Sequence, residues 1–248
     1  MLNKFLKNAV VLIFWLIVWQ IAAMLIASEV IVPTPLSTLK ALINLAKTSK
    51  FYFSVLFSLL RIIFGFLLGV TVGFLGSILA YKSKLFSAAA SPALKIIKAV
   101  PVASFIILAF YWFKSDVLPV FICFLMVLPM VWASVESGLK NIDKRYLELA
   151  KVYKLSHVKT FFNIQLPFIL PSFLSTVLTA LGFAWKSGIA AEVICRPNLS
   201  LGNLLQESKI YISTPEVFAV TAVVALLSII LEWFVKLIVR RYSDDYLK

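Results

Sequence analysis

The sequence has few acidic residues, few residues that bind metals and few cysteines. Its 248 residues include 11 Asp and Glu, one His (His157) and two Cys (Cys123 and Cys195), and 14% of them are charged. About a quarter is usual in a soluble domain. Two cysteines make no disulfide framework, and a single histidine argues against a multi-histidine metal site. The 62% hydrophobic residues and the mean hydropathy of +0.99 indicate a polytopic membrane protein.

Long apolar runs are abundant. Six of them are near the roughly 20 residues that a helix needs to cross a bilayer. They cover residues 9–27, 53–80, 96–113, 117–135, 164–191 and 217–239. The first has 19 residues, more than the apolar region of about 7–15 residues in a signal peptide, which favours a retained helix. We therefore predict an all-α fold with six transmembrane helices in one membrane domain, residues 1–248.

The net charge of +13 is explained by its distribution along the chain. Of the 24 Lys and Arg, 16 (from Lys4 to Lys248) lie on one side of the predicted membrane and six on the other, while Arg61 and Lys186 lie within spans. Because basic residues concentrate on the cytoplasmic side, both termini are predicted to be cytoplasmic, and lipid rather than nucleic acid is the expected partner of these charges. Residues 37–50, on the outer side, have helical apolar spacing typical of an interfacial amphipathic helix.

The longest cytoplasmic connection, residues 136–163, is charged yet periodic. Apolar residues recur at helical spacing at Ile142, Tyr146, Leu149 and Tyr153. A second short helix is predicted after Ser156, a candidate N-cap. Two such helices suit docking to another protein, but they would equally suit an interfacial position on lipid headgroups.

The same connection contains a spaced motif. Glu148-Leu149-Ala150 is followed, without insertion or deletion, by Ile164-Gln165-Leu166-Pro167. This resembles the EAA loop of binding-protein-dependent ABC importer permeases, whose pattern is Glu-Ala-Ala, three residues, Gly, nine residues and Ile-x-Leu-Pro. Leu149 replaces the middle Ala, and Lys154 stands where the Gly belongs. Lys either adopts the left-handed turn of that Gly, at a cost of roughly 1–2 kcal/mol, or the turn differs.

The resemblance extends over roughly residues 52–240. Further matching pairs, taken along the chain, are Pro101 with Tyr111-Trp112-Phe113, Leu128-Pro129 with Gly138-Leu139, and Ala184-Trp185 with Ala191-Glu192 and Leu201-Gly202. The last set is similar to the branch that imports nitrate, sulfonates, taurine and related small solutes.

The resemblance implies a permease subunit of an ATP-driven importer in the bacterial inner membrane. Two copies, a homodimer, would form the pathway for a small anionic solute (nitrate, a sulfonate, taurine, bicarbonate or a vitamin precursor) delivered by an extracytoplasmic binding protein. Two separate ATP-binding cassette subunits would bind ATP and Mg. This chain is expected to hold no cofactor, metal or catalytic residue: a P-loop needs Gly-Lys, and none of the eight glycines precedes Lys.

The resemblance also implies roles in the loop. Residues 136–163 would form the coupling loop that docks on the ATPase. Glu148 would cap or pair within the docked helix, Ala150 would allow close approach, and Tyr146 and Tyr153 would fill the partner's cleft. Lys154, Ile164 and Leu166 belong to the same motif, and Pro167 would start the fifth span.

Small residues form a stripe in the second span. Gly65, Gly69 and Gly73 recur at four-residue spacing, which lets another helix backbone approach closely. Packing within the chain and packing across a dimer are the two interpretations.

Ionisable residues inside the spans are candidates for function. Lys186 is predicted either to line the pathway and attract an anion, or to snorkel outward or pair with Glu192 around a break at Gly188. Glu232 is expected to pair with Lys236 one turn away, and Arg61 to lie near the outer surface without a transport role.

The alternative function is an ion-coupled secondary transporter or channel working without an ATPase. It explains the spans but not the spaced loop motif, and the chain lacks the two-halves symmetry common in such carriers. An intramembrane enzyme is disfavoured by the absence of an acidic pair or a Ser/His constellation within the spans.

Overall fold

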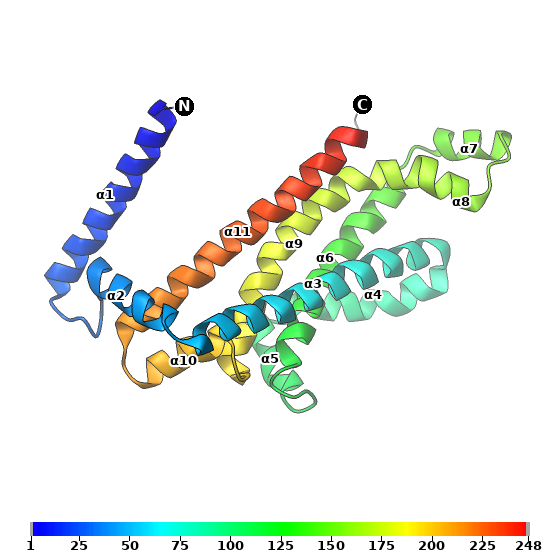
Figure 1. The fold of residues 1–248 in the computed structure, drawn as a ribbon. Helices are drawn as coiled ribbons and strands as arrows, with labels where there is room; N and C mark the ends of the chain where they lie inside the picture. The colour runs from blue at the N-terminus through cyan, green and yellow to red at the C-terminus, as the bar shows by residue number, and fades with distance from the viewer. Residues whose placement is uncertain (1, 247–248) are drawn as a thin grey trace. The chain divides into compact units, whose positions relative to one another are not determined.

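The structure, a computed structural model, describes residues 2–246, and those residues form helices and no strand (Figure 1). The predicted all-α fold is confirmed. Lys248, which contributes to the predicted orientation, lies outside the described residues. In chain order the elements are α1 (Leu2–Ile26), α2 (Pro35–Ala46), α3 (Ser49–Lys82), α4 (Lys84–Ala99), α5 (Val102–Ala109), α6 (Leu118–Lys140), α7 (Lys144–Val152), α8 (His157–Thr160), the π-helix η1 (Phe161–Gln165), α9 (Leu166–Cys195), α10 (Leu201–Ile210) and α11 (Thr214–Tyr246).

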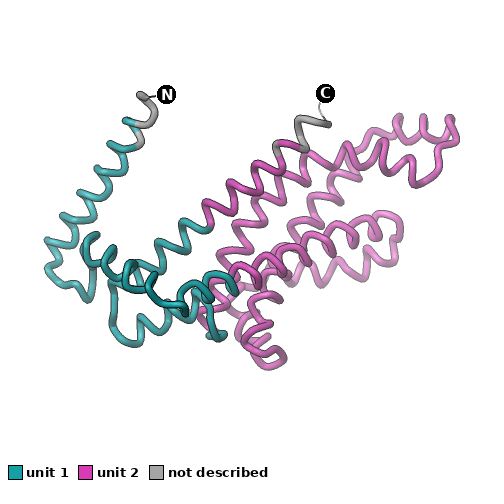
Figure 2. The backbone as a smooth tube through the Cα atoms, viewed as in Figure 1, with its two compact units in different colours: residues 1–58, 196–227 teal, residues 59–195, 228–248 magenta. Residues whose placement is uncertain are grey.

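The chain forms two compact units, coloured separately in Figure 2. The first contains residues up to 58 and 196–227, and the second contains 59–195 and the chain from 228 onward. The first unit holds α1, α2, α10, the start of α3 and the first part of α11. The second holds everything between Leu59 and Cys195 together with the end of α11.

The first unit is held by contacts of α2 and the turn before it. Thr34 caps α2 by accepting a 3.1 Å hydrogen bond from the Ser37 N–H. The Trp19 indole N–H donates to the Pro33 carbonyl at 2.9 Å, and its ring stacks on Phe218. The helix that the sequence predicts at 37–50 is present over Pro35–Ala46, so it begins two residues earlier and ends four residues earlier.

The core of the second unit is the contact of α6 with α9 and with α3. The glycine stripe of α3 lies directly against α6. A Cβ on Gly69 would stand 2.7 Å from Val127 Cβ, and one on Gly73 would stand 2.9 Å from the Leu128 carbonyl oxygen; Gly65 is equally close to the backbone of α6. The stripe therefore packs within the chain, where only glycine permits this approach.

The predicted third span, 96–113, is wrong as a continuous helix. Helices α4 and α5 meet at an angle of 107°. Pro101 has no N–H to donate and a fixed φ, and the ring restricts the residue before it. Val100 accordingly has extended backbone angles (φ −85°, ψ 133°). Within the described residues, five helices are long and apolar enough to cross a membrane, or six if the bent pair counts as one span.

The predicted fifth span, 164–191, lies within a longer helical segment. A continuous helical segment of 39 residues runs from His157 to Cys195 through α8, η1 and α9. In η1 the Leu166 N–H donates to the Phe161 carbonyl, five residues back. Pro167, the second residue of α9, would clash with the carbonyl four residues before it in a regular helix. The wider turn avoids that clash, so Pro167 follows the π-turn rather than starting the helical segment.

Candidate functional site

Helix α7 has well-defined ends. Asp143 caps it by accepting a 2.9 Å hydrogen bond from the Arg145 N–H. At the other end Lys154 has a φ of 49°, in the left-handed region. The Lys154 N–H donates to the Lys151 carbonyl at 3.0 Å, and the Leu155 N–H donates to the Ala150 carbonyl at 2.9 Å. This is a Schellman motif. Lys154 thus takes the conformation that a glycine would take at this motif position.

Apolar side chains are exposed along this helix pair. We define the docking patch as Leu149, Val152, Tyr153 and Val158, all exposed, with Tyr153 at 75%. Ala150 is only 4% exposed, so its small side chain permits close packing within this chain rather than on the outer surface. Clustered apolar side chains among charged ones are typical of a surface that contacts another molecule.

The remaining motif residues connect the patch to the continuous helical segment His157–Cys195, which we call the long helix. The Tyr146 ring packs on Phe168 of α9, with centroids 5.1 Å apart, which braces α7 against the long helix. Ile164 and Leu166 are half-buried. Glu148 is exposed, and within the described part of the chain it forms no ion pair or side-chain hydrogen bond.

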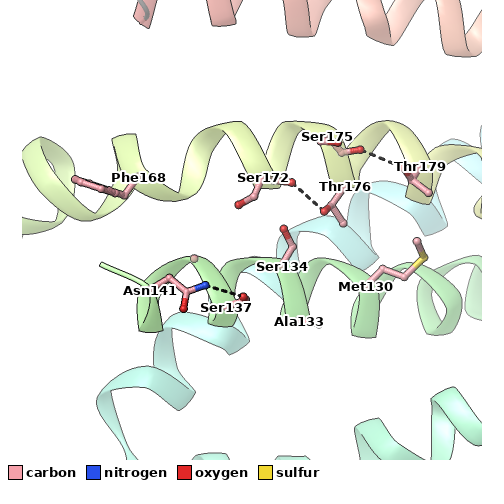
Figure 3. Close-up of a pocket in the computed structure, with 11 residues that line it drawn as sticks. Met130, Ala133, Ser134, Ser137, Asn141, Phe168, Ser172, Ser175, Thr176 and Thr179 are labelled. Carbon is pink, nitrogen blue, oxygen red and sulfur yellow. Dashed lines mark hydrogen bonds between the residues drawn. The ribbon is translucent and has the colours of Figure 1, made fainter. Parts of the chain in front are cut away.

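A groove of about 660 Å³ lies between α6 and α9 (Figure 3). We call it the hydroxyl groove because its polar lining consists of Ser134, Ser137, Asn141, Ser172, Ser175, Thr176 and Thr179, with no charged residue among the described ones that line it. The Thr176 and Thr179 hydroxyls donate to the Ser172 and Ser175 carbonyls at 2.9 and 3.2 Å. Their hydrogens are therefore satisfied within α9, and their oxygens remain able to accept.

The sequence reasoning did not single out this groove. The signal was available: Ser172, Ser175, Thr176 and Thr179 recur at i, i+3, i+4 and i+7, which places them on one helix face.

A second hollow, of about 340 Å³, continues along the same face of α9. We call it the charged hollow; it is lined by Leu178, Thr179, Gly182, Phe183, Lys186 and Glu232. Thr179 lines both cavities, so the two adjoin. Lys186 is exposed and lies nine residues before the end of α9 at Cys195.

Two predicted ion pairs are absent. Glu232 and Lys236 do not form a salt bridge in the described chain, and Glu232 instead lies against α9, with Oε1 3.3 Å from where a Cβ on Gly182 would stand. The pairing of Lys186 with Glu192 is also wrong. Residues six apart lie on different sides of a helix, and α9 has no break at Gly188.

Glu192 belongs to a separate buried cluster in the second unit. Its side chain is fully buried, and its Oε1 lies 3.6 Å from Arg61 Nη1. Arg61 Nη2 also donates to Asp116 Oδ1 at 2.6 Å. Arg61 thus links α3, the end of α9 and the turn before α6. No group of three or more His, Cys, Asp or Glu that could hold a metal occurs among the described residues.

The chain is similar to known transport proteins. It is 26% identical over 226 residues to the permease protein SsuC of Bacillus subtilis (strain 168), named for the transport of aliphatic sulfonates, covering 90% of this chain and 82% of that protein. It is 25% identical over 241 residues to the taurine transport system permease protein TauC of Escherichia coli (strain K12), covering 95% and 86%.

A solved structure shares the fold. The inward-facing MetNI methionine ABC transporter matches with a TM-score of 0.60 at 16% identity, over 77% of this chain and 93% of that one. Residues 72–244 match the family described as the binding-protein-dependent transport system inner membrane component. The chain therefore belongs to that family and is a multi-pass ABC transporter permease of the cell membrane.

Proposed function

We propose that this chain is the pathway-forming subunit of an ATP-driven importer, coupled to a separate ATPase through residues 136–163. The observation that carries the proposal is the docking patch. Leu149, Val152, Tyr153 and Val158 are exposed on short helices with defined caps, at the end of the long helix that also lines both cavities.

The docking patch lies on helices whose ends are fixed and which contact α9, so a movement of the patch would be passed to α9. The Schellman turn at Lys154 and the Asp143 and Ser156 caps fix the ends of α7 and the start of α8. The ring contact of Tyr146 with Phe168 couples α7 to the long helix. An ATPase cleft that receives Tyr153 would therefore move the long helix directly, and Glu148, exposed beside the patch, is available to pair with that partner.

The other partners follow from the same assignment. Two ATP-binding cassette subunits would bind ATP and Mg, since this chain has no P-loop. The end that carries α7 would face the cytoplasm, as would both termini, and a binding protein would deliver solute from the opposite side. A second copy of the chain would form a homodimer. The hydroxyl groove supports this, because its hydroxyl and amide groups would be costly to leave facing lipid and a facing copy would enclose them.

The solute is proposed to be small and to carry an anionic group, as sulfonates, taurine and nitrate do. Support comes from Lys186, the one cation among the described residues that line the two adjoining cavities. The names of the similar proteins, which refer to sulfonates and taurine, agree with this choice.

The test is co-purification from cells that express the chain with its neighbouring genes. Tyr153→Asp places a charge in the docking patch and is expected to lose the ATPase that the unchanged chain retains. The matched control is Tyr211→Asp, since Tyr211 is 80% exposed at the end of α10, outside the coupling loop. Retention by the control and loss by Tyr153→Asp would support the coupling loop. Absence of an ATPase from every sample would favour a carrier that works alone.

A further inference from the structure

We propose that Lys186 and Glu232 together form a binding site for a zwitterionic solute, one that carries an ammonium group and an acid group on a short chain. The inference rests on the proposed function and narrows its substrate class. The site is the charged hollow, where a cation from α9 and a carboxylate from α11 line one cavity of about 340 Å³.

The two charges face the same turn of α9. Side chains of a helix lean toward its N-terminus, so the Lys186 side chain covers the turn that contains Gly182. The Glu232 carboxylate lies against that turn, with Oε1 3.3 Å from the Cβ position of Gly182. The absence of a side chain at Gly182 leaves room for the carboxylate to lie there.

The two charges are not paired with each other. Among the described residues, no salt bridge within 4.0 Å joins Lys186 to Glu232, and neither pairs with any other described side chain. An ionisable group within a membrane span is costly unless a partner or an aqueous cavity compensates it. Both groups therefore line the cavity with charge that a ligand can complement.

The combination of signs selects the ligand. A simple anion would be attracted by Lys186 and repelled by Glu232, and a simple cation would meet the reverse. A solute with both charges would place its acid group on Lys186 and its ammonium group on Glu232, so that every charge is satisfied. Complementary charges of this kind act mainly on specificity.

The path that leads from the site toward the α7 end is neutral. Thr179 connects the charged hollow to the hydroxyl groove, and from Ser172 to Lys186 the lined face of α9 extends over about 21 Å at 1.5 Å per residue. The groove offers hydroxyl and amide groups without charge, so it can hydrate a passing zwitterion without trapping it. The charged hollow is then the place where the solute is discriminated.

The experiment measures direct binding to the complete transporter in lipid nanodiscs, without the binding protein. The probes are radiolabelled 2-aminoethanesulfonate, ethanesulfonate, which lacks the ammonium group, and 3-aminopropanoate, which replaces sulfonate by carboxylate. We expect 2-aminoethanesulfonate to bind about tenfold more tightly than ethanesulfonate, because the ammonium adds a charge-assisted contact. Similar binding of 3-aminopropanoate would place the recognition in the paired charges rather than in the sulfonate.

Variants assign the two charges. Glu232→Gln should weaken 2-aminoethanesulfonate about tenfold and leave ethanesulfonate unchanged or tighter, whereas Lys186→Met should weaken both. Lys236→Met is the matched control, since Lys236 is an exposed lysine of α11 that does not line the hollow. Melting temperatures are expected to be unchanged in all three variants.

The zwitterion assignment is overturned if the unchanged transporter binds ethanesulfonate as tightly as 2-aminoethanesulfonate, a comparison that needs no variant. It is also overturned if Glu232→Gln weakens both ligands equally. Either result leaves the proposed importer intact as long as the ATPase co-purifies; loss of that co-purification would instead remove the proposed function.

Discussion

Helix α9 contributes to two sites that each combine a cation with a glutamate, and the two sites differ in burial and pairing. Glu192 is fully buried and lies 3.6 Å from Arg61, which also binds Asp116. Lys186, six residues earlier and on another side of the helix, is exposed in an open hollow, where it shares the lining with Glu232 but forms no ion pair. The first site is closed by the protein itself, and the second is left open.

The difference distinguishes charged residues that stabilise the fold from charged residues that are available to bind a solute. A buried pair is already compensated, so it has little to offer a ligand, and removing one partner leaves a charge without compensation. An open pair of charges stabilises the fold little, but it can act on a solute. Sequence alone presents Arg61, Lys186 and Glu232 alike, as ionisable groups inside apolar runs.

The largest expected effect is that of Glu192→Leu. Because Arg61 would keep its charge in a mostly buried position with only the exposed carboxylate of Asp116 as a partner, the free energy of unfolding is expected to fall by up to about 3–5 kcal/mol. Equilibrium unfolding by denaturant in a fixed detergent measures it. Glu232→Leu is the matched variant in the open site and should change that free energy little.

The double variant Arg61→Met, Glu192→Leu sharpens this test. Replacing both partners by apolar side chains removes the uncompensated charge and should recover most of the lost stability. Equal losses from Glu192→Leu and Glu232→Leu would contradict the distinction between the two sites.

Two glycines of α9 offer a second, smaller contrast. A Cβ on Gly188 would stand 2.6 Å from Ile62 Cγ1 and 2.7 Å from Cys123 Sγ, whereas one on Gly182 would meet only the flexible end of Glu232, at 3.3 Å. Gly188→Ala should therefore destabilise by about 1–3 kcal/mol through overpacking. Gly182→Ala should not, since Ala is the better helix former. Thermal unfolding of the two variants, prepared identically, compares them; a larger loss from Gly182→Ala would reverse the assignment of the two faces.

The smallest expected effect is that of Asp116→Asn. Asp116 is 62% exposed, and exposed ion pairs contribute about 1 kcal/mol or less, even with the 2.6 Å contact to Arg61. The melting temperature should change by only a few degrees. A loss as large as that of Glu192→Leu would show that the three charges act as one unit.

Local signals predicted the caps and turns of residues 136–163 well. The motif spacing located the turn at Lys154, and the candidate N-cap Ser156 does begin α8, accepting a hydrogen bond from the Lys159 N–H at 3.3 Å. Caps and turns depend on a few neighbouring residues, so their chemistry can be read from the sequence.

Contacts between residues far apart in the sequence, and the exact ends of the helices, were harder to predict. The pairing of Arg61 with Glu192 joins residues 131 positions apart, and no local pattern indicates it. The break at Pro101 was missed because hydropathy continues across it while the backbone does not. The helix that contains the predicted fifth span begins earlier than the apolar run, because its first turns are polar and the Ser156 cap and backbone hydrogen bonds keep them helical.

The π-turn η1 determines where the long helix bends most easily. No loop intervenes between His157, where the helical segment begins, and Lys186, about 43 Å away at 1.5 Å per residue. A push at one end must therefore either displace the other or be absorbed by bending. Bending concentrates where the regular hydrogen-bond ladder is interrupted, at Phe161–Gln165. Under the proposed coupling to an ATPase, the compliance of those five residues would set how much of its movement reaches the solute.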